Sequence, residues 1–327
     1  MSAYGRFSSF SSARGVVAGA LLAAAAIATA AGLLVLIRER DDGRSPSTEI
    51  PRASDTIAFV RGKQEISSDI YVARKDGSDL RRLTRGPGFK YDPDWSPDGR
   101  WLLYRYEPPG PTASTPEQIG LVVMRADGTE AVDIAARARV YSGPASWAPS
   151  HDRIAFAGGR PGEPSSIYVI RRDGSHLRRL TPMGREAQYP AWSPDGKAIA
   201  FTYVEPGGGF SIYRVPASGG QVERLTAGPK DNWPAWSPDS SRIAFSRGDS
   251  IWTIAADGSD ARLVTSRGGA PLNWSPSAEV VFACPGRGGS VRSCAIAPDG
   301  SGFWRLLGGA EGGFPAWRPA PVPRSQR

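Results

Sequence analysis

Residues 190–201 read PAWSPDGKAIAF, and the Pro-Trp core of this stretch recurs five more times along the chain. The Pro lies two residues before the Trp at Trp95, Trp192, Trp236 and Trp317, and three residues before it at Trp147 and Trp274. Successive Trp residues are 52, 45, 44, 38 and 43 positions apart. A period of this size indicates a repeat protein in which each repeat is one supersecondary unit.

Each repeat continues with the same series of turns and strands. The Trp is followed by a turn such as Ser193-Pro194-Asp195-Gly196, with Pro and Gly where a type I turn favours them. Two apolar strands come next, as in Ile199-Ala200-Phe201 and Ile212-Tyr213-Arg214. A hairpin turn, mostly Asp-Gly, then leads to a short final strand such as Arg179-Leu180-Thr181. With the Trp strand, each repeat predicts the four antiparallel strands of a propeller blade.

The points at which the repeats begin and end predict a closed ring. The first repeat starts at Ile57 without a Trp strand, and the last ends at Trp317 with its Trp strand alone. Residues 315–317 therefore complete the sheet begun by residues 57–84, which removes an exposed sheet edge. We predict an all-β fold over residues 55–318: a six-bladed β-propeller with four-stranded blades, in which the C-terminal strand joins the N-terminal blade.

Composition and motifs exclude several classes of protein. The 327 residues carry a formal charge of +8, but residues 55–318 hold 32 basic and 28 acidic residues with no basic run, which argues against nucleic-acid binding. Two His and two Cys are too few for a three-His or four-Cys zinc site. The chain has no Gly-x-Ser-x-Gly, P-loop or His-Glu-x-x-His motif. We therefore predict no catalytic residue, metal or cofactor.

The N-terminal segment predicts a membrane anchor. Residues 15–37 carry no charge and, as a helix of roughly 34 Å, are long enough to span a bilayer. Residues 1–14 form a short polar tail, 38–54 a linker, and 319–327 a C-terminal tail. A cleaved signal peptide ending at Ala28-Thr29-Ala30 is the alternative, in which case the protein is secreted. The anchor is favoured because apolar residues 33–37 continue beyond that point.

The repeat resembles that of TolB-type propellers. The resemblance rests on the series W-S-P-D-G, I-A-F, I-Y-V, D-G-S and R-L-T, is clearest at 192–201 and 167–181, and covers residues 55–318. It implies an exported, non-catalytic scaffold that binds a protein, a peptide or a cell-envelope polymer. No α/β domain precedes the propeller here, which weakens any inference to the role of TolB itself. A hydrolase or lyase that uses the propeller channel is the alternative function.

The position just before the Pro of each Trp strand carries the candidate binding residues. It holds Asp92, Gly143, Tyr189, Trp233, Ala270 and Phe314. If the Trp strand is innermost, these residues surround one mouth of the central channel, together with Tyr91, Arg185 and Asn232. Aromatic side chains beside charged ones are typical of ligand or peptide recognition. The alternative is ordinary loop packing.

The two cysteines lie on successive strands of one repeat. Cys284 and Cys294 are ten residues apart, and Cys294 stands where other repeats have Tyr71 and Tyr168. They form a disulfide if the hairpin brings their Cα atoms within about 7 Å, and are otherwise two buried thiols. A disulfide indicates an oxidising compartment. Together with the exported relatives that the resemblance implies, it favours an extracytoplasmic propeller.

Overall fold

The computed structural model describes residues 56–63, 67–109, 119–150, 152–266, 269, 271–285, 291–306 and 313–317. The predicted tail 1–14, anchor 15–37, linker 38–54 and C-terminal tail 319–327 lie outside these ranges. Among the described residues, no helix has the length and apolar character needed to cross a bilayer.

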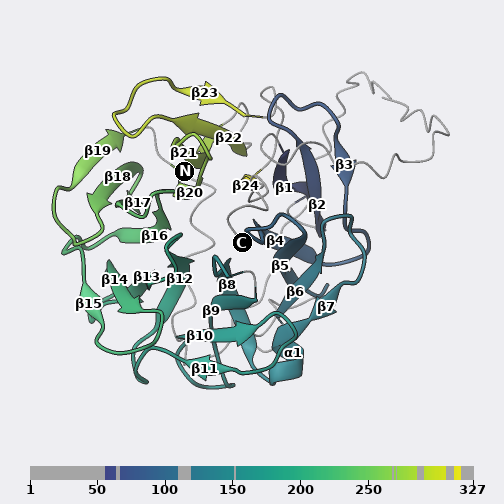
Figure 1. Ribbon diagram of the computed structural model, residues 1–327, viewed down its shortest axis with the longest axis horizontal. Coiled ribbons are helices and arrows are strands. Elements are labelled where there is room, and N and C mark those ends of the chain that lie inside the picture. Colours follow the sequence, from purple (N-terminus) through teal and green to yellow (C-terminus); the bar gives the residue numbers. More distant parts are fainter. Residues whose placement is uncertain are drawn as a thin grey trace, which may run out of the picture. The chain divides into compact units, whose positions relative to one another are not determined.

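The described residues form six four-stranded antiparallel sheets arranged around a common axis, as Figure 1 shows. Blade 1 consists of β24 (Gly313–Trp317), β1 (Thr56–Lys63), β2 (Ser67–Arg74) and β3 (Arg81–Arg82). Blade 2 consists of β4 (Phe89–Trp95), β5 (Trp101–Glu107), β6 (Gly120–Arg125) and β7 (Val132–Asp133). Blade 3 consists of β8 (Tyr141–Trp147), β9 (Arg153–Gly159), β10 (Ser166–Arg171) and β11 (Arg178–Arg179).

The other three blades repeat this order of strands. Blade 4 consists of β12 (Ala187–Trp192), β13 (Ala198–Val204), β14 (Phe210–Pro216) and β15 (Glu223–Arg224). Blade 5 consists of β16 (Asp231–Trp236), β17 (Arg242–Arg247), β18 (Ser250–Ala255) and β19 (Arg262–Thr265). Blade 6 consists of β20 (Pro271–Trp274), β21 (Val280–Pro285), β22 (Val291–Ile296) and β23 (Trp304–Arg305). The predicted six-bladed propeller is confirmed.

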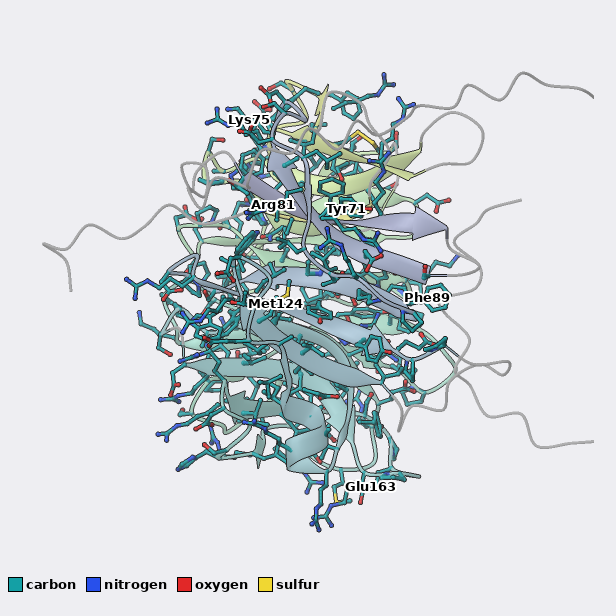
Figure 2. The ribbon with its side chains drawn as sticks, turned by 90° about the vertical axis from the view of Figure 1, so that its right-hand side faces the viewer. Tyr71, Lys75, Arg81, Phe89, Met124 and Glu163 are labelled. Carbon is teal, nitrogen blue, oxygen red and sulfur yellow. A yellow bond between two sulfur atoms is a disulfide. The ribbon has the colours of Figure 1, made fainter. Side chains whose placement is uncertain are left out.

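The ring closes through the predicted pairing of the two ends of the repeat region. β24 pairs antiparallel with β1, with Ile57 opposite Trp317 and Ala58 opposite Ala316. Figure 1 shows that the Trp strands lie nearest the axis and the two-residue strands lie at the rim. Figure 2 shows Phe89, at the start of an inner strand, and Lys75, beside an Asp-Gly hairpin, on opposite faces of the ring. We call these the strand-start face and the hairpin face.

The six Trp residues of the repeat are buried between blades. The indole N–H of Trp147 donates to the carbonyl of Asp94 in the preceding blade at 3.1 Å, and Trp236 makes the equivalent bond to Ala191. The apolar clusters also join neighbours, as where Ile167 of blade 3 packs with Phe201 of blade 4. The middle strands are buried on both faces by these contacts, which explains their almost continuous apolar sequence.

The Asp-Gly hairpins also join neighbouring blades. Gly258 in blade 5 has φ +88°, and a Cβ added there would lie 3.1 Å from the carbonyl oxygen of Leu225 in blade 4. Gly128 approaches Leu83 in the same way across blades 2 and 1. Each of these positions therefore favours glycine for two reasons: the turn has a positive φ, and the backbone of the preceding blade lies close to the Cα atom.

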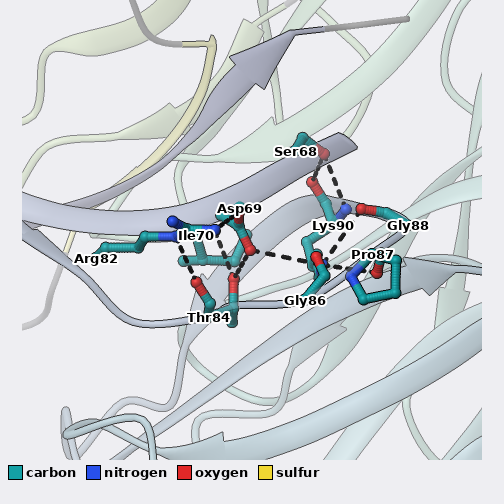
Figure 3. Close-up of polar contacts among 9 residues, drawn as sticks. All are labelled: Ser68, Asp69, Ile70, Arg82, Thr84, Gly86, Pro87, Gly88 and Lys90. Carbon is teal, nitrogen blue, oxygen red and sulfur yellow. Dashed lines mark hydrogen bonds and ion pairs between the residues drawn. The ribbon is translucent and has the colours of Figure 1, made fainter. Parts of the chain in front are cut away.

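The Arg-Leu-Thr stretch ends the outer strand earlier than the sequence predicted. In blade 4 the strand covers Glu223–Arg224, and the Thr226 hydroxyl instead accepts a bond from the Ile212 N–H at 3.0 Å. Thr84 accepts from Ile70 in the same manner, as Figure 3 shows. In blade 2 a short helix, α1 (Ile134–Ala138), capped by Asp133, follows the outer strand. The repeat pattern of the sequence does not predict this helix.

Candidate functional site

A β-bulge shapes the start of several inner strands. The register against the second strand shifts between Tyr91 and Asp94 in blade 2 and between Asn232 and Ala235 in blade 5. The residue before the Pro is the irregular one: φ is +48° at Asp92, +51° at Tyr189 and +59° at Trp233. This conformation is uncommon outside glycine and unfavourable for bulky residues. A bulge redirects the side chain at that position, and strained backbone of this kind gathers at binding sites.

Two of these residues meet across the seam between blades 4 and 5. The rings of Tyr189 and Trp233 are 4.8 Å apart between centroids, with an angle of 33° between their planes. The Trp233 side chain is also hydrogen-bonded to the Tyr189 phenol. Burial raises the pKa of Tyr189 to about 12, so the phenol is neutral at physiological pH. The pair forms an apolar surface with a polar edge.

An ion pair from blade 2 completes the site. Arg105 donates to the Asp92 carboxylate at 2.7 Å, and its guanidinium lies 5.4 Å from the centroid of the Tyr91 ring. Burial opposes the charge of Arg105, but the interactions with its neighbours, that with the Asp92 carboxylate being the largest, outweigh this and raise its pKa. Arg105 of blade 2 therefore interacts electrostatically with Tyr189 of blade 4. In blade 3, which lies between them, the residue at the equivalent position is Gly143. We call Tyr91, Asp92, Arg105, Tyr189 and Trp233 the axial cluster.

The other predicted residues have different positions. Asn232 supports Trp233, because its side-chain oxygen accepts from the Trp233 N–H at 2.9 Å and from the Thr202 hydroxyl at 2.8 Å. Arg185 does not join the axial cluster. It donates to Glu205 at 3.0 Å and lies 4.1 Å from the centroid of the Tyr203 ring. Phe314 lies in β24, in the first half of the strand that closes the ring.

Arg105 is a member of the axial cluster that is not among the residues predicted from the sequence. It lies on β5 directly opposite Tyr91. Comparing the repeats would have found it, because the equivalent residues elsewhere are uncharged. They are Val60, Ala157, Thr202, Ser246 and Ala283. A single charge in a row of small or apolar residues is the signal.

The axial cluster is suited to recognition rather than to acid–base catalysis. Its carboxylate, Asp92, is ion-paired with Arg105. Burial raises the pKa of both Tyr91 and Tyr189, so these phenols, neutral at physiological pH like any tyrosine, stay protonated to an even higher pH. The nearby Asp94 accepts a bond from the Trp147 N–H in the next blade. Within the described ranges, no three His, Cys, Asp or Glu side chains converge as a metal ion would require.

The structure joins Cys284 to Cys294 by a disulfide, with 5.9 Å between the Cα atoms. Cys294 lies opposite Phe282 on the paired strand, so the bond runs diagonally across the hairpin on one face of blade 6. Both cysteines are buried.

Fold and site together define a class: a closed six-bladed propeller with an aromatic and ion-paired cluster beside its axis. Residues 120–321 match the family model of the TolB beta propeller domain. This match covers more than half of the chain, and the chain belongs to that family.

The similar proteins include TolB proteins of several bacteria. A stretch of 51 residues is 37% identical to the Tol-Pal system protein TolB of Nitratidesulfovibrio vulgaris; it makes up 16% of this chain and only 12% of that relative's length. The crystal structure of TolB from Acinetobacter baumannii has a TM-score of 0.66 and 22% identity, over 82% of this chain and 67% of its own. A putative TolB from Agrobacterium tumefaciens has a TM-score of 0.61 and 23% identity, over 80% and 91%. At these identities the two structures show a common fold.

Proposed function

We propose that this protein is a non-catalytic scaffold of the cell envelope, tethered to the membrane by residues 15–37, that binds a protein or peptide partner at the axial cluster. The observation that carries the proposal is the contact between Tyr189 and Trp233, two large rings held at positive φ at the start of neighbouring inner strands. Aromatic residues with a few fixed polar groups are the usual anchors of binding surfaces. The Asp92–Arg105 pair supplies those polar groups.

Three observations support an extracytoplasmic location. The disulfide between Cys284 and Cys294 is of a kind that persists in oxidising compartments. The uncharged segment 15–37 suits either an anchor or an export signal. The relative in Nitratidesulfovibrio vulgaris is a protein of the Tol-Pal system, which favours an envelope protein as partner.

The proposal is tested by chemical crosslinking and co-purification from native membranes. The full chain is compared with the double variant Tyr189→Ala/Trp233→Ala. We expect a partner that co-purifies with the wild type and is lost from the double variant, because both rings of the anchor are removed. Capture of the same partner by both proteins would exclude the axial cluster as the binding surface.

A matched control removes exposed apolar side chains far from the axis. Leu177 is exposed just before the outer strand of blade 3, and Leu263 is exposed within the outer strand of blade 5. The variant Leu177→Ala/Leu263→Ala should capture the partner as the wild type does. Unfolding curves of all three proteins separate loss of binding from loss of fold, and a reporter fused after Arg327 checks the location of the propeller.

A further inference from the structure

The hairpin of blade 3 carries a charged residue where three other blades carry a small one. The residue just before its Asp-Gly pair is Arg172, and the equivalent residues of blades 2, 4 and 5 are Ala126, Ala217 and Ala256. Ala126 and Ala217 are buried in apolar clusters that they share with the preceding blade. Arg172 is only half-buried. A long cationic side chain therefore stands at the seam between blades 2 and 3.

Blade 2 contributes an unusual residue to the same seam. The first residue of its second strand is Trp101, and no other blade has an aromatic residue there. The equivalent residues are Thr56, Arg153, Ala198, Arg242 and Glu279. The guanidinium carbon of Arg172 lies 4.0 Å from the centroid of the Trp101 ring. Because a guanidinium packs well on an aromatic face, the indole holds Arg172 in place across the seam.

A cavity of about 160 Å³ lies at this seam, and both Trp101 and Arg172 line it. The other lining residues come from blade 2, from α1, which Figure 1 shows where blade 2 adjoins blade 3, and from the hairpin of blade 3. They are Val123, Glu130, Val132, Arg137 and Asp173. The volume is below the roughly 300–1,000 Å³ of sites that enclose a drug-sized ligand. The cavity, which we call the seam cavity, therefore suits a single functional group.

Arg137 of α1 is the second cationic residue of the seam cavity. Its Nη1 atom donates to the backbone carbonyl of Asp173 at 3.2 Å. Its aliphatic part lies against Gly174, where an added Cβ would be 3.1 Å from the Cβ atom of Arg137. Contacts along its length thus place this side chain across the hairpin of blade 3, on the same cavity as Arg172.

The two carboxylates that line the seam cavity already have partners. Glu130 is ion-paired with Arg125 at 2.7 Å. Asp173 accepts a bond from the Ser175 N–H at 2.8 Å, and the hydroxyl and the N–H of Ser175 lower the pKa of Asp173. Both acids are therefore charged and engaged within their own hairpins, at the edge of the blade.

The two arginines, by contrast, keep positive charge available. Among the residues that the structure describes, no carboxylate lies within ion-pair distance of Arg137 or Arg172. A phosphate monoester carries a charge of about −1.5 to −2 at pH 7 and three acceptor oxygens, whereas a carboxylate carries a single charge. Guanidinium groups bind phosphate oxygens through paired N–H donors. Two such groups at one small cavity match the charge of a phosphate better than that of a carboxylate.

We propose that the seam cavity binds a phosphate monoester, whose oxygens accept hydrogen bonds from Arg137 and Arg172. Trp101 supports the site by holding the Arg172 guanidinium on its ring. The site contains none of the residues of the axial cluster, so its test is independent of the proposed function.

The test is a calorimetric titration of the full chain with glycerol 3-phosphate at constant ionic strength. We expect saturable binding to the wild type. The variant Arg172→Ala introduces the residue of blades 2, 4 and 5 and should weaken binding by at least about tenfold. The matched control Arg171→Ala removes the neighbouring arginine, which pairs with Asp152 and does not line the cavity, and should retain binding. Absence of saturable binding to the wild type, or equal binding by Arg172→Ala, would overturn the proposal.

A second variant keeps the test decisive if Arg172→Ala does not fold. Arg137→Gln retains most of the aliphatic part that lies on Gly174 and removes the charge, so it should also weaken binding. Unchanged binding by this variant would count against the site. Acetate, which carries one charge, should bind the wild type more weakly than glycerol 3-phosphate does. Equal or tighter binding of acetate would contradict a phosphate site.

A further probe distinguishes the two sources of a phosphate monoester. Dihexanoyl phosphatidic acid carries the same glycerol phosphate group on a short-chain lipid. Tighter binding of this lipid indicates the headgroup of a membrane lipid, whereas tighter binding of glycerol 3-phosphate indicates a soluble phosphate ester. Both results support the site, provided that Arg172→Ala weakens the binding.

Discussion

Asp94 shows how one side chain both joins two blades and carries an energetic cost. Its Oδ2 atom accepts from the Trp147 N–H of the next blade at 3.1 Å. Burial raises the pKa of its carboxyl from 3.8 to about 6, because desolvation disfavours the charged form more than the hydrogen bonds favour it. In blade 3 the neutral hydroxyl of Ser146 makes the equivalent bond to Trp192. The contact therefore needs an acceptor but not a charge.

The replacement Asp94→Asn should stabilise the protein at neutral pH. Between about pH 4 and pH 6 the folded state holds a proton that the unfolded state has released, so the wild type loses stability as the pH rises through this range. The Asn variant keeps the acceptor and avoids that loss. We expect it to be more stable by on the order of 1–3 kcal/mol at pH 7.5 and equal to the wild type near pH 4. Urea unfolding at a series of pH values measures the difference, and a gap independent of pH would contradict the assignment.

Trp233 is held in a backbone conformation that its side chain disfavours, since its φ is +59°. If the bulge imposes this conformation, Trp233→Gly should be more stable than Trp233→Ala by about 1 kcal/mol, because glycine adopts positive φ without steric cost. Both variants remove the ring, so their comparison isolates the backbone. Equal unfolding free energies, or a more stable Ala variant, would show that the bulge relaxes.

The sequence predicted only part of the arrangement around the axis. It placed Tyr91, Asp92, Tyr189 and Trp233 together by their position in the repeat, and the structure groups these four in the axial cluster; their role in binding stays a prediction. It did not identify Arg105, which a comparison of the repeats singles out, but whose electrostatic interaction with Tyr189 of blade 4 forms only in the closed ring. It grouped Arg185 with them by proximity in the chain. Glu205 and the ring of Tyr203 hold that guanidinium instead.

At the scale of the element, the hairpin and the outer strand are defined by contacts with their neighbours. The Asp-Gly pairs predicted the hairpins correctly through local turn preferences. The packing of each hairpin on the preceding blade has no signal in the local sequence, because it depends on how neighbouring blades are arranged around the axis. The same holds for the outer strands, where the Thr226 hydroxyl bonds to the neighbouring strand and the ladder ends at Arg224.

The hairpin contact predicts a difference between two glycines with similar backbones. Gly258 has φ +88° and lies close to the carbonyl oxygen of Leu225, whereas Gly184 has φ +91° and nothing within 4 Å of an added Cβ. Both substitutions to Ala strain the backbone, but Gly258→Ala also requires the Leu225 carbonyl of blade 4 to shift by a few tenths of an ångström. We expect it to be less stable than Gly184→Ala by about 1–3 kcal/mol in urea unfolding. Equal losses would indicate that the hairpin does not support the blade interface.

At the scale of the whole molecule, ring closure was the best-supported prediction. It rested on two separate observations, the strand missing from the first repeat and the extra strand at the end of the last. The first repeat lacks a Trp strand and the last repeat consists of a Trp strand alone. As this arrangement predicts, β24 pairs with β1. The interactions across the axis could not be predicted in this way. They depend on how close the inner strands of different blades come around the ring, as in the electrostatic interaction between Arg105 of blade 2 and Tyr189 of blade 4.

The disulfide should stabilise the ring by constraining blade 6. It links residues ten positions apart, and a loop of this length corresponds to about 3 kcal/mol. Adding a reductant should lower the midpoint of urea unfolding of the wild type. The variant Cys284→Ser/Cys294→Ser serves as the control and should not respond to the reductant. A wild type that does not respond would show that the thiols are free or that the bond adds no stability.

The measurement that tests the central claim most directly is site-specific photocrosslinking of the full chain in native membranes. A photoreactive phenylalanine analogue replaces Trp233 in the axial cluster or, in a second protein, the exposed Phe303 at the rim of blade 6. If the axial cluster is the binding surface, a discrete partner is crosslinked from position 233 and not from position 303. The same products from both positions, or a discrete partner from position 303 alone, would contradict the account.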